Sequence, residues 1–138
     1  MTWASGAVVS YDLTLINAKT LQEADDGAPL GTTADVTGAL CEAFEGRMEW
    51  AIDEGYLIGG PYYLEVSLEP ASEEDMVRAV HIVAKGDLTT LPDRLARLCR
   101  ARGWRVSDPQ CGDWNLDQPP ELQNVSFWRA LWNAVRGR

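Results

Sequence analysis

The sequence predicts a single α+β domain in which a small two- to three-stranded sheet packs with four helices. Three observations favour this class. The chain has 138 residues, the usual size of one domain. It alternates between stretches with apolar residues at every second position and stretches with apolar residues three and four apart. It contains no long polar linker and no internal repeat, so residues 1–138 are expected to form one domain.

The first half of the chain is expected to form two strands and one long helix. Residues 8–16 are rich in β-branched and aromatic side chains and alternate with polar ones, which predicts a half-buried strand. Residues 25–31 have the Asp, Gly and Pro content of a loop. Residues 34–54 are expected to be helical, with Thr33 as the N-cap, and residues 62–69 form the second strand. The apolar face of the helix comprises Val36, Leu40, Ala43, Phe44, Met48, Ala51 and Ile52.

The second half is expected to be mainly helical. Ser72 followed by Asp75 resembles a capping box, and it predicts a helix from there to about Lys85. The remaining elements, in order, are a helix that starts at Thr90 or Leu91 and ends at Gly103, a short strand at 104–107, a loop at 108–124 and a helix that starts at Ser126.

Charge is distributed unevenly along the chain. The net charge is −9. Residues 1–75 hold two basic and fifteen acidic residues, a net charge of −13, whereas residues 76–138 hold ten basic and six acidic residues, a net charge of +4. Such asymmetry bears on electrostatic fields and binding partners rather than on the fold.

The cysteines and the N-terminus indicate a cytoplasmic protein. No basic residue precedes a short apolar stretch at the N-terminus, and no apolar run is long enough to span a membrane. Cys41, Cys99 and Cys111 are odd in number and lack metal-ligand spacing. We therefore expect them to be small buried apolar side chains, with no disulfide, metal or cofactor.

Known catalytic motifs are missing from the sequence. His81 is the only histidine, no lysine follows the glycine of Gly31-Thr32-Thr33 as a phosphate loop requires, and no GxGxxG occurs. These absences argue against an enzyme. An enzyme with a motif-free site remains an alternative, and Asp108, Asp113 and His81 are the first residues to examine in that case.

Four acidic residues recur at steps of three and four within the predicted helix 34–54. Glu42, Glu45, Glu49 and Asp53 would lie on one face of that helix, opposite its apolar face. The ordinary interpretation is a solvated helix face. The sharper interpretation is a binding stripe for a basic partner, since further acids lie in the same half of the chain: Asp25, Asp26, Glu65, Glu69, Glu73 and Glu74.

Five arginines without an intervening acid occupy the second half: Arg94, Arg97, Arg100, Arg102 and Arg105. A nucleic-acid site is disfavoured because the net charge of the chain repels phosphate and no aromatic residues are interleaved in the helical part of the run. We expect these arginines to neutralise acids of the first half, either within the chain or across a homodimer.

Two fragments resemble a known group of proteins. Residues 10–13 read Ser-Tyr-Asp-Leu at the start of a strand, and residues 98–110 run from a helix through a glycine and a short strand to Asp108-Pro109-Gln110. This order resembles small, largely uncharacterised bacterial proteins that are similar to immunity-like proteins encoded beside toxins. The resemblance covers about 20 of the 138 residues and implies no catalytic residue.

The sequence therefore leads to three functional expectations. The first is a small acidic protein-binding inhibitor, an immunity protein that neutralises a basic bacterial toxin through opposite charge. The second is a phage-type anti-defence protein whose acidic surface imitates nucleic acid. The third is an enzyme with a motif-free site, and a dimeric scaffold is left open as well.

Overall fold

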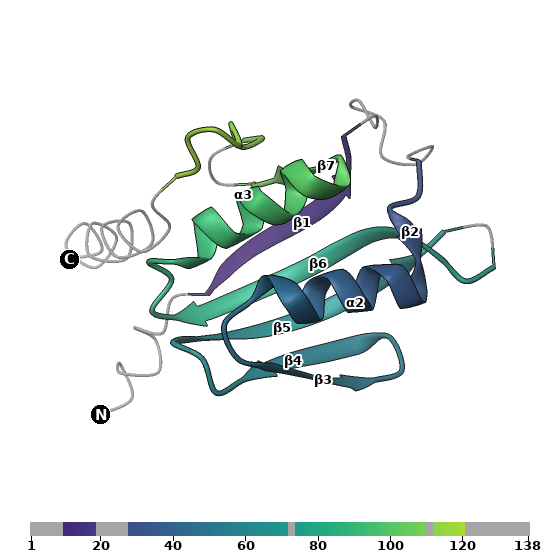
Figure 1. The fold of residues 1–138 in the computed structure, drawn as a ribbon, viewed down its shortest axis with the longest axis horizontal. Coiled ribbons are helices and arrows are strands. Elements are labelled where there is room, and N and C mark those ends of the chain that lie inside the picture. Colours follow the sequence, from purple (N-terminus) through teal and green to yellow (C-terminus); the bar gives the residue numbers. More distant parts are fainter. Residues whose placement is uncertain (1–9, 19–27, 72–73, 110–111, 121–138) are drawn as a thin grey trace, which may run out of the picture.

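A computed structural model describes residues 10–18, 28–71, 74–109 and 112–120. Within these residues, seven strands form one antiparallel sheet and two helices lie on one of its faces (Figure 1). The strand order is β3-β4-β5-β6-β1-β7, and the short strand β2 also pairs with β6. The described residues thus form an α+β domain, but the predicted two- to three-stranded sheet packed with four helices is wrong, because seven strands and two helices are present among these residues.

The elements have the following bounds: β1 Tyr11–Asn17, β2 Gly31–Thr32, α2 Thr33–Ala43, β3 Arg47–Ala51, β4 Glu54–Ile58, β5 Tyr62–Pro70, β6 Met76–Gly86, α3 Leu91–Arg102 and β7 Trp104–Ser107. The predictions of β1, β5, α3 and β7 are confirmed. The predicted helix that starts at Ser126 lies outside the described residues.

The predicted helix from Ser72 to Lys85 is wrong, because Met76–Gly86 forms β6, an eleven-residue strand between β5 and β1. Val80, Ile82 and Ala84 of β6 are buried and alternate with His81, Val83 and Lys85, but apolar residues also occur among the less buried positions. A bulge opposite Glu69 and Pro70 also shifts the register, which hides the period of two. Asp75, assigned to a helix cap, instead has a φ of 60° in the turn before β6.

The predicted helix over residues 34–54 ends much earlier than expected. Thr32, rather than Thr33, caps α2 by accepting a hydrogen bond from the Asp35 N–H at 3.1 Å. The helix stops at Ala43, and β3 and β4 follow as a hairpin. Met48 and Trp50, which alternate with exposed Arg47 and Glu49, show the period of two that the helical interpretation overlooked.

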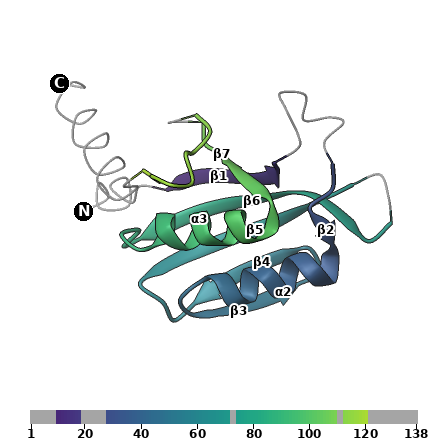
Figure 2. The same ribbon diagram turned by 45° about the horizontal axis from the view of Figure 1, so that its top comes forward.

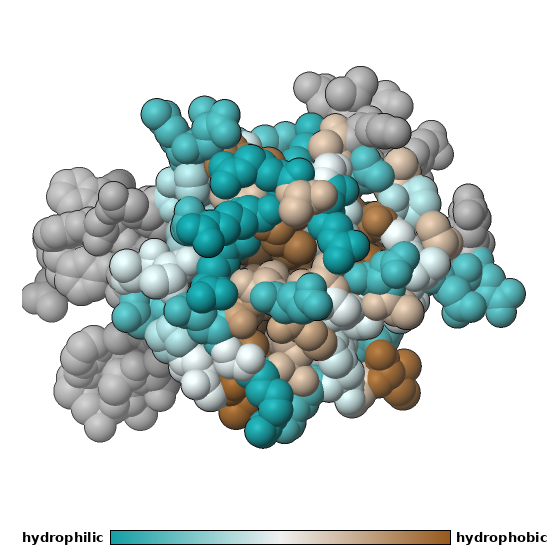
Figure 3. Space-filling model, in the orientation of Figure 1, coloured by the Kyte–Doolittle hydropathy of each residue, from teal (hydrophilic) through white to brown (hydrophobic). Residues whose placement is uncertain are grey.

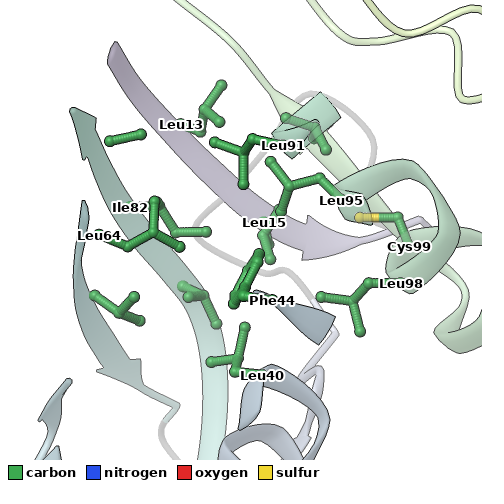
Figure 4. Packing of buried hydrophobic residues seen from close by; sticks show 14 of the residues in the cluster. Leu13, Leu15, Leu40, Phe44, Leu64, Ile82, Leu91, Leu95, Leu98 and Cys99 are labelled. Carbon is green, nitrogen blue, oxygen red and sulfur yellow. The ribbon is translucent and has the colours of Figure 1, made fainter. Parts of the chain in front are cut away.

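The hydrophobic core lies between the sheet and its two helices. The helices lie side by side on the same face of the sheet (Figures 1 and 2). Leu13 and Leu15 from β1 meet Leu91 and Leu95 from α3, and Leu40 of α2 is buried in the same cluster (Figure 4). No described helix is long and apolar enough to cross a membrane.

Neither described helix covers the opposite face of the sheet, which we call the open face. Its positions alternate with the buried ones, as in antiparallel sheets that face water on one side. The paired residues Thr14, His81 and Ser67 form one row across it, and Asp12, Val83, Glu65 and Tyr56 form the next. The open face therefore carries the polar and charged side chains of the sheet.

Candidate functional site

The four acidic residues predicted to share one helix face are spread over four structural contexts. Glu42 lies on α2, Glu45 in the connection after it, Glu49 on β3 and Asp53 in the turn between β3 and β4. The single acidic helix stripe is therefore wrong, since the helix that would carry it ends at Ala43. Their role in partner binding stays a prediction.

Two of these carboxylates are engaged within the chain. Glu45 accepts a hydrogen bond from the Thr90 hydroxyl at 2.6 Å and pairs with Arg94 at 3.4 Å. It thereby joins the end of α2 to the start of α3. Glu49 pairs with exposed Arg47 at 2.9 Å on the same strand. Surface pairs of this kind contribute little to stability.

Asp53 lines a hollow of about 360 Å³ at one end of the sheet, which we call the acidic hollow. Three acidic residues, Asp53, Glu74 and Asp75, line it, and no basic residue does among those that the structure describes. The remaining lining residues are Thr33, Leu68, Pro70, Ala71, Met76 and Val77. A hollow with acidic walls and an apolar lining suits a group that combines positive charge with an aliphatic stem.

Backbone hydrogen bonds fix the framework of the acidic hollow. The Leu68 N–H donates to the Asp53 carbonyl at 2.9 Å, which ties the β3–β4 turn to β5. The Thr33 N–H donates to the Asp75 carbonyl at 2.8 Å, which ties the start of α2 to the turn before β6. Segments distant in sequence therefore line one hollow, with Asp53 from the β3–β4 turn and Glu74 and Asp75 from the turn before β6.

Ile52, the residue before Asp53, is an exposed apolar side chain at the tip of the hairpin. Its side chain is 96% exposed, and its φ is 61°. Positive φ at the first of two turn residues is normally taken by glycine, and a β-branched residue there is strained. The hairpin thus presents an apolar group beside an acidic hollow, a combination that occurs at protein-binding surfaces.

The acidic hollow combines acidic residues with an apolar lining. Among the residues that the structure describes, no three His, Cys, Asp or Glu side chains are placed to hold a metal. On the open face, the Tyr56 hydroxyl donates to Glu54 at 3.1 Å, and this hydrogen bond raises the pKa of Tyr56. A guanidinium or ammonium group in the hollow would lie near acidic residues of two segments, Asp53 on one and Glu74 and Asp75 on the other.

A second polar cluster lies on the open face around His81. Its Nε2 lies 2.8 Å from Glu69 Oε1, and its Nδ1 shares a hydrogen bond of 3.2 Å with Thr14 Oγ1. Arg78 Nε also donates to Glu69, at 2.6 Å. The hydrogen bond with His81, helped by Arg78, lowers the pKa of Glu69.

This hydroxyl–imidazole–carboxylate chain resembles a nucleophile with its base, but its surroundings do not support catalysis. Thr14 lies on β1, which pairs with β6 on one side and β7 on the other. The nearby strand N–H groups are therefore used by the ladder and cannot form an oxyanion hole. Glu69 is also shared with Arg78. We interpret the cluster as a network of polar side chains that links neighbouring strands.

Asp108 and Asp113, the other residues singled out for a motif-free enzyme, have structural partners. The buried Asp108 carboxylate accepts hydrogen bonds from the Tyr11 hydroxyl at 2.8 Å and from Trp114 Nε1 at 2.9 Å. Asp113 pairs with Arg105 at 3.3 Å. These contacts hold the segment after β7 against the sheet.

The arginine run neutralises acids, but mostly not those expected. Arg94 pairs with Glu45 of the first half, as predicted. The other pairs within the described residues lie inside the second half: Arg97 with Asp93, Arg100 with Asp117 and Arg105 with Asp113. Arg94, Arg97 and Arg102 also line a groove of about 340 Å³ between α2 and α3, together with Glu42. Apolar surface is visible between the polar side chains on this side of the molecule (Figure 3).

The two cysteines within the described residues differ in exposure. Cys99 is buried in the core, and burial raises the pKa of its thiol to about 12. Cys41 is exposed, contrary to expectation, and accepts a hydrogen bond from Trp50 Nε1 at 3.4 Å. Cys111 lies outside the described residues.

Fold and site together define a small α+β protein with an open sheet face and an acidic hollow. Compared with known proteins, the chain matches no family model, no curated protein and no solved structure.

Sequence reasoning missed part of the acidic hollow. Asp75 was assigned to a helix cap, and Ile52 was placed on a buried helix face. The signal for Ile52 is spacing: Ile52 and Asp53 separate two short alternating segments by two residues, as in a tight hairpin. No comparable local signal places Asp75.

Proposed function

We propose that this protein is a small acidic inhibitor that binds a basic protein, most specifically an immunity protein that neutralises a basic bacterial toxin in the cytoplasm. The observation that carries the proposal is the acidic hollow formed by Asp53, Glu74 and Asp75 beside the exposed Ile52. The resemblance to immunity-like proteins and the net charge of −9 support it.

In this proposal, an arginine or lysine of the partner inserts its charged end into the acidic hollow. Its aliphatic stem packs along Leu68, Pro70 and Met76, which line the same hollow. Ile52 inserts into an apolar recess of the partner. The net negative charge accelerates encounter with a basic protein, and this acceleration weakens as salt screens it.

The proposal gives different weights to the four predicted contact residues. Asp53 is the central one, because it lies in the acidic hollow. Glu42 and Glu49 are exposed and serve as peripheral charges. Glu45 is assigned no direct role, since Thr90 and Arg94 already engage it.

The test is affinity capture from the source organism at low salt, followed by elution with rising salt and mass spectrometry. Two variants are compared with the unmodified protein. The hollow variant carries Asp53→Asn, Glu74→Gln and Asp75→Asn, and the control variant carries Asp12→Asn, Glu65→Gln and Asp93→Asn. Both remove three negative charges, so they separate local recognition from overall charge.

We expect one stoichiometric basic protein that the hollow variant fails to retain and the control variant keeps, and whose toxicity the unmodified protein abolishes. Equal loss with both variants would contradict a role of the acidic hollow. A captured nucleic-acid-binding protein that DNA or RNA displaces would instead support nucleic-acid mimicry.

A further inference from the structure

β3 forms one edge of the sheet, and its outward backbone groups can be identified from the pairing. The Leu68 N–H bonds to the Asp53 carbonyl, so residue 53 faces β5. Because strand residues alternate in direction, Glu54 and its even-numbered successors in β4 face β3. Their partners Ala51, Glu49 and Arg47 therefore face inward. The N–H and carbonyl groups of Met48 and Trp50 consequently point away from the sheet.

Within the described residues, the chain covers the β7 edge of the sheet but not the β3 edge. At the β7 edge, the Trp114 N–H donates to the Val106 carbonyl at 3.1 Å, so the segment after β7 covers that edge. At the β3 edge, no described segment bonds to the outward groups of Met48 or Trp50. Figure 1 shows β3 along the border of the molecule.

β3 also lacks several of the devices that usually prevent strands from pairing with one another. It contains no proline and no lysine, and its register with β4 runs without a bulge over five residue pairs. Its two charged residues, Arg47 and Glu49, have opposite signs and stand on the same face two positions apart. A strand of this kind is suited to pairing with another copy of itself.

We propose that two copies of this chain form a homodimer through antiparallel pairing of their β3 strands, centred on Met48. In this register Met48 lies opposite Met48 of the second copy, and both present outward backbone groups, as a hydrogen-bonded pair requires. Arg47 of each copy then lies opposite Glu49 of the other. Two ion pairs form across the interface, and both sheets join into one.

Charge selects this register over its neighbour. If the pairing of the two β3 strands were centred on Glu49, Met48 of one copy would lie opposite Trp50 of the other. The outward backbone groups would then also match. This pairing would, however, place the two Glu49 carboxylates directly opposite each other, and like charges at that position are destabilising. The register centred on Met48 places opposite charges there instead. The acidic hollows stay free, because Ile52 and Asp53 lie beyond the paired region.

The first test is a charge swap followed by sedimentation equilibrium at low salt. Glu49→Arg alone and Arg47→Glu alone each place like charges across the interface and are expected to weaken the dimer roughly tenfold. The double variant Arg47→Glu with Glu49→Arg restores opposite charges and should restore the dimer. A monomer at all concentrations, or a dimer that neither single change weakens, would overturn the proposal.

A second test reads the register directly. In a background with Cys41 and Cys111 changed to serine, Arg47→Cys and Glu49→Cys chains are oxidised separately and as a mixture. Opposed residues in a non-hydrogen-bonded pair lie close enough for a disulfide, so the mixture should crosslink as a heterodimer far more than either chain alone. Equal crosslinking of Glu49→Cys alone would overturn this register.

Hydrogen exchange tests the same interface without substitutions near the charges. The Met48 and Trp50 N–H groups should become protected as protein concentration rises, because they gain partners in the dimer. The Glu49 N–H, which faces β4, serves as the internal control. Fast exchange at Met48 and Trp50 in a sample shown to be dimeric would place the dimer contact elsewhere and refute β3 pairing.

Discussion

The indole ring of Trp50 lies over Gly55, its partner across the β3–β4 hairpin. A Cβ atom at position 55 would lie 2.6 Å from Trp50 Cζ3 and 2.9 Å from the Met48 Cε methyl carbon. Gly55 therefore makes room for the half-buried ring that closes the core at this edge. Glycine is required at position 55 because of the limited space. Its backbone conformation does not require glycine, since its φ is not positive.

Gly55→Ala is expected to lower the free energy of unfolding by about 1–2 kcal/mol, because the ring must leave its place or the strands must separate. Urea denaturation measures the change. Gly38→Ala in α2 is the matched control, as a Cβ there meets nothing within 4 Å. It should stabilise the protein by about 0.5–1 kcal/mol. Equal effects of the two changes would contradict the packing described.

Asp108→Ala should be among the more damaging single changes. It leaves the Tyr11 hydroxyl and the Trp114 indole N–H without their acceptor in a buried place. We expect a loss of about 3 kcal/mol in the free energy of unfolding. Asp108→Asn, which keeps one acceptor oxygen, should cost less. An Asn variant as unstable as the Ala variant would show that the charge, rather than the acceptor, matters at this position.

The two described thiols should differ in reactivity. With the thiol pKa raised to about 12, only about one Cys99 side chain in ten thousand is a thiolate at pH 8, and it is buried. In a Cys111→Ser variant, a thiol reagent is therefore expected to label Cys41 quickly and Cys99 only on unfolding. Labelling of both thiols at one rate in the native protein would contradict the burial of Cys99.

Acid stability should depend on Glu69. Its pKa is lowered in the folded chain, chiefly by the hydrogen bond with His81, so it contributes stability above its ordinary pKa of 4.5. That contribution is lost as pH falls through the lowered pKa. In the Glu69→Gln variant, the urea midpoint should therefore decrease less as the pH is lowered than it does in the unmodified protein. Glu65→Gln removes the same charge from the same strand but leaves the hydrogen bond with His81 intact. Its urea midpoint should therefore decrease more at low pH than that of the Glu69→Gln variant.

The fold could be predicted from the sequence where local pattern and tertiary structure agree. The alternation at β1 and β5 and the Gly103 stop after α3 are of this kind. The sequence predicts a helix at β6 because Met76, Ala79, Val80 and Val83 have helical spacing and the bulge breaks the alternation of the strand. The predicted helix over residues 34–54 includes β3, because apolar residues happen to continue at helical spacing past Ala43.

The candidate site could be predicted only in part. An acidic first half indicates a basic partner, and Asp53, one of the four predicted contact residues, lines the acidic hollow rather than a helix face. Which residues surround Asp53 in the hollow depends on the positions of the hairpin turn and of the β5–β6 connection. Hydrogen bonds between distant segments fix these positions. No local pattern contains that information.

The most direct test of the acidic hollow is a titration of the isotopically labelled protein with a hexa-arginine peptide, followed by NMR at two salt concentrations. The account predicts shifts centred on Asp53, Glu74 and Asp75. It also predicts that binding is weakened about tenfold or more in the hollow variant and far less in the equally charged control variant. Shifts spread over all acidic residues, or equal weakening in both variants, would show that overall charge rather than the acidic hollow attracts the cation.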